Sequence, residues 1–211
     1  MPTAIEFLTQ YYYKPFDELE RLDIKCLRDY AMQIPTDEIY KNIPGRPAIV
    51  ASAVIVNPNF TRILVMHHRL HGFYKQLGGH ADGDKNLLNV AMREASEEAG
   101  ISAYPMSREP FDFVIWTMGA RTKNNIFYPQ HNVMDVAFLF CCHDNAKLKL
   151  QKKEGLDLKW ISLDEWRDMK FDPNNETIKL NPQNSIYNPR ITRKIEINRH
   201  ALQHSTLINA H

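Results

Sequence analysis

One stretch of the chain, residues 79–101, decides how the sequence is interpreted; it reads GHADGDKNLLNVAMREASEEAGI. Three carboxylates, Glu94, Glu97 and Glu98, fall within five residues of a strong helical pattern. Spacings of three and four residues place all three on one face of a helix. Three negative charges held together are unfavourable unless a cation offsets them, and hard divalent ions such as Mg2+ prefer oxygen ligands. The stretch therefore predicts a metal site and, with it, phosphate chemistry.

The same stretch resembles the Nudix box, whose pattern is G-x5-E-x7-R-E-U-x-E-E-x-G-U, with U an aliphatic residue. Ala95 is a small stand-in for the first U, and the first Glu of the pattern falls on Lys85. The matching residues are Gly79, Arg93, Glu94, Glu97, Glu98, Gly100 and Ile101. The run from Leu77 to Asp84 also resembles a bacterial subgroup of this family with a Gly-Gly-His-x-Asp sequence. The resemblance covers roughly residues 47–170.

The order of predicted elements indicates an α/β protein, because strand patterns alternate with a few helical ones. The resemblance implies the Nudix fold, a mixed β-sheet sandwiched between helices. We divide the chain into an N-terminal helical extension (1–43), the Nudix domain (44–170), and a C-terminal loop and helix (171–211) that pack on the same domain.

Individual elements follow from periodicity and from turn residues. Helices are expected at 3–13, 16–33, from about Asn86 to Gly100, after Ser162, and at 191–207. Asp82 and Asp84 suit a turn and the start of the box helix, and Ser162 with Glu165 resembles a capping box. Strands are expected at 48–56, 62–67, 111–118, 133–142 and 156–161, and residues 171–189 are predicted to be a loop.

The resemblance implies a divalent-metal-dependent hydrolase that cleaves a pyrophosphate bond. Its substrate would be a nucleoside diphosphate linked to another group, or a nucleoside triphosphate, and its cofactor Mg2+ or Mn2+. One alternative is a Nudix-fold sensor that binds a nucleotide without turnover. A prenyl-diphosphate isomerase is a weaker alternative, because the cysteine and glutamate signatures expected of it are not evident.

Glu97 and Glu98 are predicted to be the main metal ligands, and Glu94 a third ligand or the base that orients water. By resemblance, the carbonyl of Gly78 reaches the metal and Arg93 holds the carboxylates in place. His80 and Gly79 are expected to contact the substrate phosphate.

Residues outside these roles leave alternatives open. Asp135 and Glu154 are further candidates for a ligand or for the general base, beside Glu94 and Glu98. His67, His68 and His71 do not form a recognised zinc pattern, so we assign them to structure or surface. Phe111, Trp116, Phe127 and Tyr128 have the chemistry to stack on a base, although aromatic side chains in strands more often belong to a core.

Lys85 departs from the pattern in a way that affects function. The glutamate usual at this position pairs with the arginine of the box, which a lysine cannot do. We expect Lys85 to lie near Arg93 as a like charge, with Asp82 or Asp84 taking over the pairing. Its consequence is either the harmless loss of a supporting contact or reduced activity, which is the sequence support for the sensor.

Composition indicates an ordinary globular protein, with 44% hydrophobic and 24% charged residues in 211. A formal net charge of +1 argues against an electrostatically driven nucleic-acid binder. The odd number of cysteines, three, does not suggest a disulfide framework. Neither a signal peptide nor a membrane span is apparent, so we expect a cytoplasmic protein. A homodimer is a further expectation.

Overall fold

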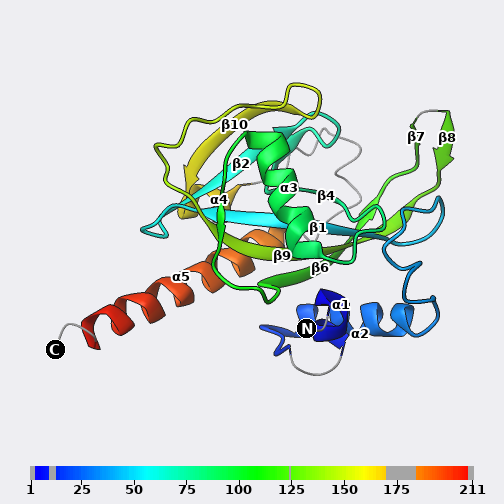
Figure 1. The fold of residues 1–211 in the computed structure, drawn as a ribbon, viewed down its shortest axis with the longest axis horizontal. Helices are drawn as coiled ribbons and strands as arrows, with labels where there is room; N and C mark the ends of the chain where they lie inside the picture. Colours follow the sequence, from blue (N-terminus) through cyan, green and yellow to red (C-terminus); the bar gives the residue numbers. More distant parts are fainter. Residues whose placement is uncertain (1–2, 10–12, 124, 170–183, 209–211) are drawn as a thin grey trace.

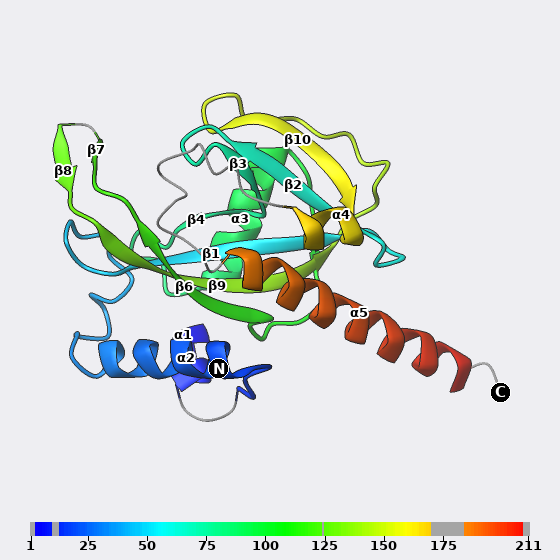
Figure 2. The same ribbon diagram turned by 180° about the vertical axis from the view of Figure 1, so that it is seen from behind.

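The structure is a computed structural model and describes residues 3–9, 13–123, 125–169 and 184–208. A curved mixed β-sheet lies between helices (Figure 1). Helix α3 (Leu87–Ala99) covers one face, and α4 (Leu163–Asp168) and α5 (Asn184–Ile208) lie on the opposite side (Figure 2). Helices α1 (Ala4–Thr9) and α2 (Glu18–Ala31) pack together, and α2 contacts β6. The predicted α/β class and the sandwich of helices about a mixed sheet are confirmed.

The main sheet has eight strands, and its central path runs β10-β2-β1-β9-β5. Strand β3 pairs with β2, β4 with β1 and β6 with β9, whereas β7 and β8 form a separate two-stranded sheet. The strands are β1 (Ala48–Val56), β2 (Arg62–His68), β3 (Phe73–Lys75), β4 (Leu77–His80), β5 (Tyr104–Pro105), β6 (Asp112–Met118), β7 (Arg121–Lys123), β8 (Ile126–Tyr128), β9 (His131–Cys141) and β10 (Gly155–Ser162).

The centre of the sheet is the parallel pair β1 and β9, in register from Ala48 opposite Val133 to Val56 opposite Cys141. All residues of β1 are buried. A strand covered on both faces reads as a continuous apolar run rather than an alternating one, which is why β1 is so evident in the sequence. Its predicted bounds, 48–56, are confirmed.

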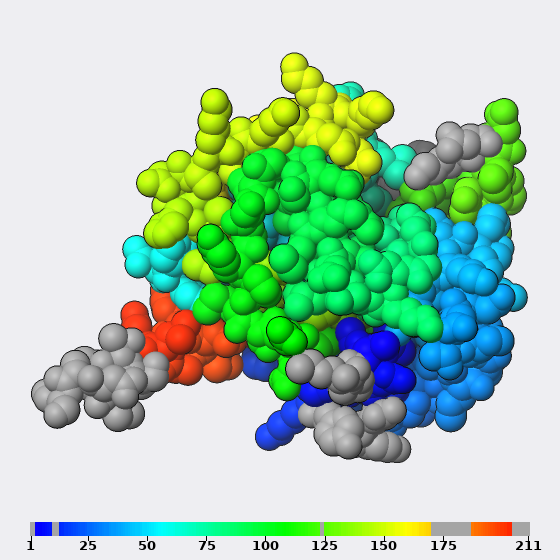
Figure 3. Space-filling model, in the orientation of Figure 1, coloured from blue at the N-terminus to red at the C-terminus, as the bar shows by residue number. Residues whose placement is uncertain are grey.

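Two hydrophobic cores lie on opposite sides of this sheet. The first contains the inner face of α3, with Val90, Ala91 and Ala95, together with residues of α1 and α2. The second contains side chains of α4 and α5, including Trp166 and Ile191. In the space-filling view, α3 covers the centre of one face and the N-terminal helices lie beside it (Figure 3).

Helix α3 begins and ends where local chemistry predicts. The Asn86 side chain accepts the backbone N–H of Asn89 at 3.2 Å and caps the helix, while Asp84 forms the turn before it by accepting the N–H of Asn86 at 2.8 Å. Gly100 ends the helix with φ of 66°, a left-handed conformation that favours glycine. The cap is therefore Asn86, rather than the aspartates that precede it.

The other helices differ more from the sequence-based bounds. Helix α1 ends at Thr9, whereas the prediction ran to residue 13, and residues 10–12 lie outside the described part. Ser162 caps α4 by accepting the N–H of Glu165 at 3.0 Å, as expected. Helix α5 begins at Asn184, so the loop prediction for 171–189 is wrong from that residue on, and its earlier part, 171–183, is not described. Pro189 and the surrounding asparagines suggested a loop, but Pro189 is the sixth residue of the helix, where it cannot donate a backbone hydrogen bond to residue 185.

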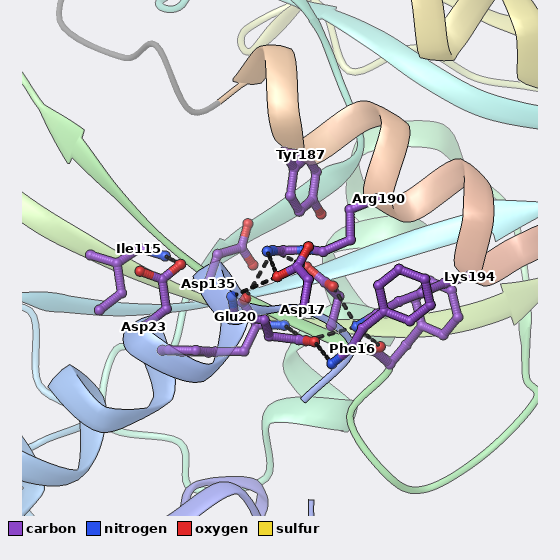
Figure 4. Close-up of polar contacts among 12 residues, drawn as sticks. Phe16, Asp17, Glu20, Asp23, Ile115, Asp135, Tyr187, Arg190 and Lys194 are labelled. Atoms are coloured by element: carbon purple, nitrogen blue, oxygen red, sulfur yellow. Dashed lines mark hydrogen bonds and ion pairs between the residues drawn. The ribbon is translucent and has the colours of Figure 1, made fainter. Parts of the chain in front are cut away.

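A buried ionic cluster attaches α5 to the N-terminal helices (Figure 4). The Lys194 ammonium lies 2.7 Å from a carboxylate oxygen of Glu20 and 2.6 Å from one of Asp112. The Arg190 guanidinium lies 2.9 Å from the other Asp112 oxygen. Glu20 and Asp112 are fully buried, so each carboxylate depends on these cations for compensation, and Glu20 also accepts backbone N–H groups such as that of Phe113. The cluster fixes the first turns of α5 against the sheet.

The three cysteines are free thiols, in agreement with the prediction that they form no disulfide framework. Among the described residues, none of the helices is both long enough and apolar enough to span a membrane.

Candidate active site

The glycines at the start of the box bring β4 close to its neighbours. Gly78 has φ of 155°, and a Cβ there would lie 2.6 Å from the Ala51 carbonyl oxygen. A Cβ on Gly79 would lie 2.6 Å from the carboxyl carbon of Glu94. Any larger residue at position 79 would push this carboxylate away, so Gly79 is the residue that lets α3 place an acid directly on β4.

Glu98 is the most deeply buried acid of the box, with 1% of its surface exposed. One carboxylate oxygen, Oε2, accepts the Gly78 N–H at 2.9 Å, and the other, Oε1, is buried without a hydrogen-bond partner among the described residues. Burial, together with the charges of Glu94 and Glu154, raises the pKa of Glu98 to about 7 against the opposing effects of Lys75 and the Gly78 N–H. This carboxylate lacks a neutralising partner.

Arg93 lies on the outer side of the same helix and touches two of the acids. Its Nη2 lies 3.0 Å from Glu94 Oε1, and its Nε lies 3.8 Å from Glu97 Oε1. Glu94 is half-buried, and burial raises its pKa. Glu97 is exposed. Arg93 therefore holds Glu94 and Glu97 side by side, with Glu94 turned toward the sheet.

Lys85 does not lie against Arg93, and that expectation is wrong. Its ammonium forms an ion pair with Asp37, a residue of the segment between α2 and β1. Neither Asp82 nor Asp84 forms an ion pair with Arg93, although the charge of Asp84 contributes to raising the pKa of Arg93. The chain has Lys85 where the family pattern has a glutamate. Arg93 is still paired, because Glu94 and Glu97 are its partners.

Three side chains that could bind a metal ion lie close together at the box helix. One ligand atom each from His68, Glu98 and Glu154 lies within 4.8 Å of the others. His68 comes from β2, and Glu154 lies just before β10. Of the two later acids considered from the sequence, Glu154 is thus the one beside Glu98. The His68 Nδ1 accepts the backbone N–H groups of Leu70 and His71, which leaves the ring proton of the neutral imidazole on Nε2 as a donor.

A cavity of about 720 Å3 opens beside these groups, a size suited to a small molecule. Its acidic end contains Glu94 and Glu154, and the glycine strand contributes Gly78, Gly79 and His80. Apolar and aromatic side chains form much of the remaining wall: Val50, Leu70, Phe73, Tyr74, Val114, Trp116, Met118, Val133 and Trp166. Of the aromatic residues considered for stacking, Trp116 lines the cavity and Phe127 is 62% exposed on the β7–β8 hairpin.

Four cationic residues also line the cavity, Arg69, Lys75, Arg121 and Lys153, and two of these, Lys75 and Arg121, belong to strands β3 and β7. Neither forms an ion pair with a carboxylate of the described residues, and Arg121 Nε is buried without a hydrogen-bond partner there. Burial, followed by the charge of Lys75, lowers the pKa of His68 to about 3 and that of His71 to about 2. These imidazoles are therefore neutral near pH 7, and the positive charge available to an anionic ligand comes from the lysines and arginines that line the cavity. None of these four cations was predicted, because a single lysine or arginine outside a motif gives no sequence signal.

Asp135 lies at another part of the same cavity, and it is 4% exposed. Burial raises its pKa to about 6, against the hydrogen bonds of Ser52 and Gln76 and the charge of Lys75. Tyr187 and Asn188, in the first turns of α5, line the cavity nearby. The sequence placed both in a loop and so gave no reason to assign them to the site.

Comparison with models of protein families identifies one domain in the chain. A model of the NUDIX domain matches residues 46–180, which is more than half of the chain. A comparison with proteins of curated function gave no match.

Solved structures with a similar fold include a NUDIX-family hydrolase, a MutT protein and a pyrophosphohydrolase. A NUDIX-family hydrolase from Clostridium perfringens has 18% identity and a TM-score of 0.47, over 71% of this chain and 97% of that one. A MutT protein from Methanosarcina mazei Go1 has 20% identity and a TM-score of 0.46, over 74% and 99%. The E. coli dihydroneopterin triphosphate pyrophosphohydrolase has 16% identity and a TM-score of 0.47, over 64% and 92%. With such low values, the assignment depends on the domain model alone.

Proposed function

This chain belongs to the NUDIX hydrolase family, whose members act on phosphoric anhydrides, and from that premise we propose a specific reaction. The protein hydrolyses the pyrophosphate bond of a nucleoside diphosphate linked to a second group, or of a nucleoside triphosphate. The reaction depends on a divalent cation, Mg2+ or Mn2+. The observation that carries the proposal is Glu98, a buried carboxylate with one unpaired oxygen. A second carboxylate, that of Glu154, lies close to it.

The residues at this site fit a hard divalent cation. An unpaired buried carboxylate is costly, and a cation bound to Glu98 Oε1 removes that cost. Carboxylate oxygens from α3 and from the segment before β10 form an oxygen-rich set of the kind that Mg2+ and Mn2+ prefer. We assign Glu98 and Glu154 as principal ligands, with Glu94 as a third ligand or the base that orients water. Glu97, at the exposed rim, and the Gly78 carbonyl complete the proposed set.

The chain's own residues then divide the work of the reaction. A bound divalent ion neutralises phosphate oxygens and lowers the pKa of its bound water. Arg93 positions Glu94 and Glu97 without touching the substrate. His80 and Gly79 contact the phosphate groups, and Lys75 and Arg121 balance phosphate charge. The aromatic and apolar wall surrounds the rest of the substrate and limits access of water.

The sensor hypothesis loses its sequence support, because Lys85 pairs with Asp37 at the surface and Arg93 keeps two carboxylate partners. No observation favours the isomerase. A homodimer in the cytoplasm stays a prediction.

The direct test is a hydrolysis screen with and without Mg2+. The panel contains nucleoside triphosphates, ADP-ribose, dinucleoside polyphosphates and coenzyme A, with release of phosphate or nucleotide as the readout. We expect turnover of at least one member that EDTA abolishes. Failure to hydrolyse any of them, together with micromolar binding of a nucleotide, contradicts the proposal and favours the sensor.

A further inference from the structure

A buried polar corner of the cavity has no role in the hydrolysis proposed above. It is formed by Ser52 of β1, Gln76 between β3 and β4, Asp135 of β9 and Tyr187 of α5. Asp135 Oδ2 accepts two hydrogen bonds, from Ser52 Oγ at 2.9 Å and from Gln76 Nε2 at 3.4 Å. Oδ1 of the same carboxyl is buried and has no donor among the described residues. The protein thus leaves one strong acceptor unsatisfied in a ligand cavity.

Tyr187 supplies the complementary donor. Its hydroxyl oxygen accepts the Gln76 amide at 2.9 Å, and no described residue accepts its proton. Burial, followed by the charge of Asp135, raises the pKa of Tyr187 well above its usual value, so the hydroxyl keeps its proton. Because Asp135 and Tyr187 both bind the same Gln76 nitrogen, the acceptor and the donor lie close together. Figure 4 shows Tyr187 projecting from α5 toward the sheet on which Asp135 lies.

The surroundings of this corner suit a flat ring. Trp116 lines the cavity from β6 and is half-buried, and Val50, Val114 and Val133 line it from three strands of the sheet. Aromatic and aliphatic walls pack against the faces of a heteroaromatic ring, while polar groups at its edge determine which ring is accepted. A buried acceptor beside a buried donor selects an edge that presents a donor beside an acceptor.

We propose that this corner binds a heteroaromatic base whose amino group lies beside a ring nitrogen, as in adenine and cytosine. The amino group donates to Asp135 Oδ1, and the ring nitrogen accepts the Tyr187 proton. Bases in which a carbonyl replaces the amino group, such as hypoxanthine and uracil, place an oxygen against the carboxylate and a ring N–H against the hydroxyl. Asp135 is then a specificity residue rather than the general base. The inference rests on the proposed function, for which it names the substrate class.

Nucleoside monophosphates test this directly, because they contain no anhydride bond and cannot be hydrolysed at one. Titration calorimetry with Mg2+ present compares AMP with IMP and CMP with UMP. We expect the amino-bearing member of at least one pair to bind about 10-fold tighter or more, since the wrong edge leaves a buried polar group unpaired. Equal binding within both pairs overturns the proposal.

Variants locate the preference in the protein. In Asp135→Asn the side chain can present either an oxygen or an amide N–H, so we expect the preference to fall to within about threefold. Tyr187→Phe removes only a hydroxyl and should weaken the same preference independently. Asp144→Asn is the matched control, because it removes the same charge from a residue outside the cavity lining. An unchanged preference in Asp135→Asn, or a loss of kcat with the preference intact, overturns the proposal.

The outcomes also separate this inference from the proposed hydrolysis. If none of the four nucleotides binds but another anhydride is hydrolysed, the inference fails and the hydrolase stands. If the base preference is found but no anhydride is cleaved, the hydrolase fails and the recognition site stands.

Discussion

Glu20 and Glu98 are both almost completely buried, with 0% and 1% of their surfaces exposed, yet they differ in what surrounds their charge. Burial raises the pKa of Glu20, but the charge of Lys194 and several hydrogen bonds outweigh it, so the net pKa is lowered. At Glu98 the same burial is opposed only by Lys75 at longer range and by one backbone N–H, and the pKa rises to about 7. One carboxylate is compensated within the protein, and the other is not.

This difference separates structural charge from functional charge. In the cluster of Glu20, Asp112, Arg190 and Lys194 each carboxylate has a cation partner, although Arg190 Nε is without a hydrogen-bond partner among the described residues, and the cluster holds α2 and α5 to the sheet. The charges of Glu94 and Glu154 instead raise the pKa of Glu98, and one oxygen of that carboxylate stays unpaired. A buried carboxylate without a neutralising partner destabilises the fold unless a bound ion or ligand pairs with it. Such a carboxylate therefore marks a binding site.

The largest expected effect is on activity, from Glu98→Gln. We predict that Mg2+-dependent hydrolysis falls at least about 100-fold, because even outer-shell partners of a metal cost 10–100-fold when removed. The free energy of unfolding without metal should not fall, since an uncompensated buried charge is removed. Glu97→Gln should have a smaller effect, because Glu97 is exposed. Rates within threefold of the wild type in Glu98→Gln would show that this carboxylate has no part in the reaction. The control is Glu109→Gln, a substitution of an exposed glutamate.

The second prediction concerns the buried ionic cluster, from which Lys194→Met removes one cation. It leaves Glu20 and Asp112 buried without this cation, so we predict a loss of about 3–5 kcal/mol in the free energy of unfolding. The site residues are untouched, and kcat measured below the melting transition should change little. Urea unfolding gives the stability, with Lys25→Met as the control because Lys25 forms only an exposed ion pair. A loss below about 1 kcal/mol would mean that the cluster contributes little.

Asp23 sharpens the comparison, because it lies beside the compensated cluster but is not itself neutralised. Burial raises its pKa to about 6, so the stability linked to its protonated form is present below about pH 4 and is lost as the pH rises through 6. Asp23→Asn avoids this loss, and its amide oxygen can still accept the Ile115 N–H. We expect the variant to gain about 1–3 kcal/mol over the wild type between pH 4.5 and pH 8. The same difference at both pH values in urea unfolding would contradict the assignment.

The smallest effect is expected for Lys85→Glu, which restores the family pattern at that position. Lys85 is exposed and paired with Asp37, and Arg93 already has its carboxylates. We predict hydrolysis within about threefold of the wild type, measured as kcat/KM with any substrate from the panel. A gain of tenfold or more would revive the hypothesis of an impaired enzyme.

What the sequence predicted depended on how local the physical signal was. Strand β1 was predicted to the residue, because an unbroken apolar run of that length, rich in β-branched residues, is typical of a strand buried on both faces. The end of α3 followed from Gly100, whereas the residue that caps its start is Asn86 and not one of the aspartates expected from the sequence. Lys85 was placed wrongly because its partner, Asp37, comes from a different segment. Glu20 and Lys194 are 174 positions apart, and no local pattern indicates that they meet.

The site shows the same division. The box acids were found from their helical spacing and the glycines from the resemblance to the Nudix box, and Glu154 was one of two later acids considered. Lys75, Arg121 and Tyr187 reach the cavity only through the pairing of strands and the docking of α5. Tyr187 was also hidden by Pro189 and its neighbours, which suggested a loop.

Binding of Mn2+ to the wild type and to Glu98→Gln, followed by electron paramagnetic resonance, tests the central claim most directly. The claim is that the uncompensated acids of α3 and Glu154 hold a divalent cation. We predict saturable binding by the wild type and at least 10-fold weaker binding by the variant, with both proteins folded by circular dichroism. Equal binding by the two proteins, or hydrolysis by the wild type that persists without any divalent cation, would contradict it.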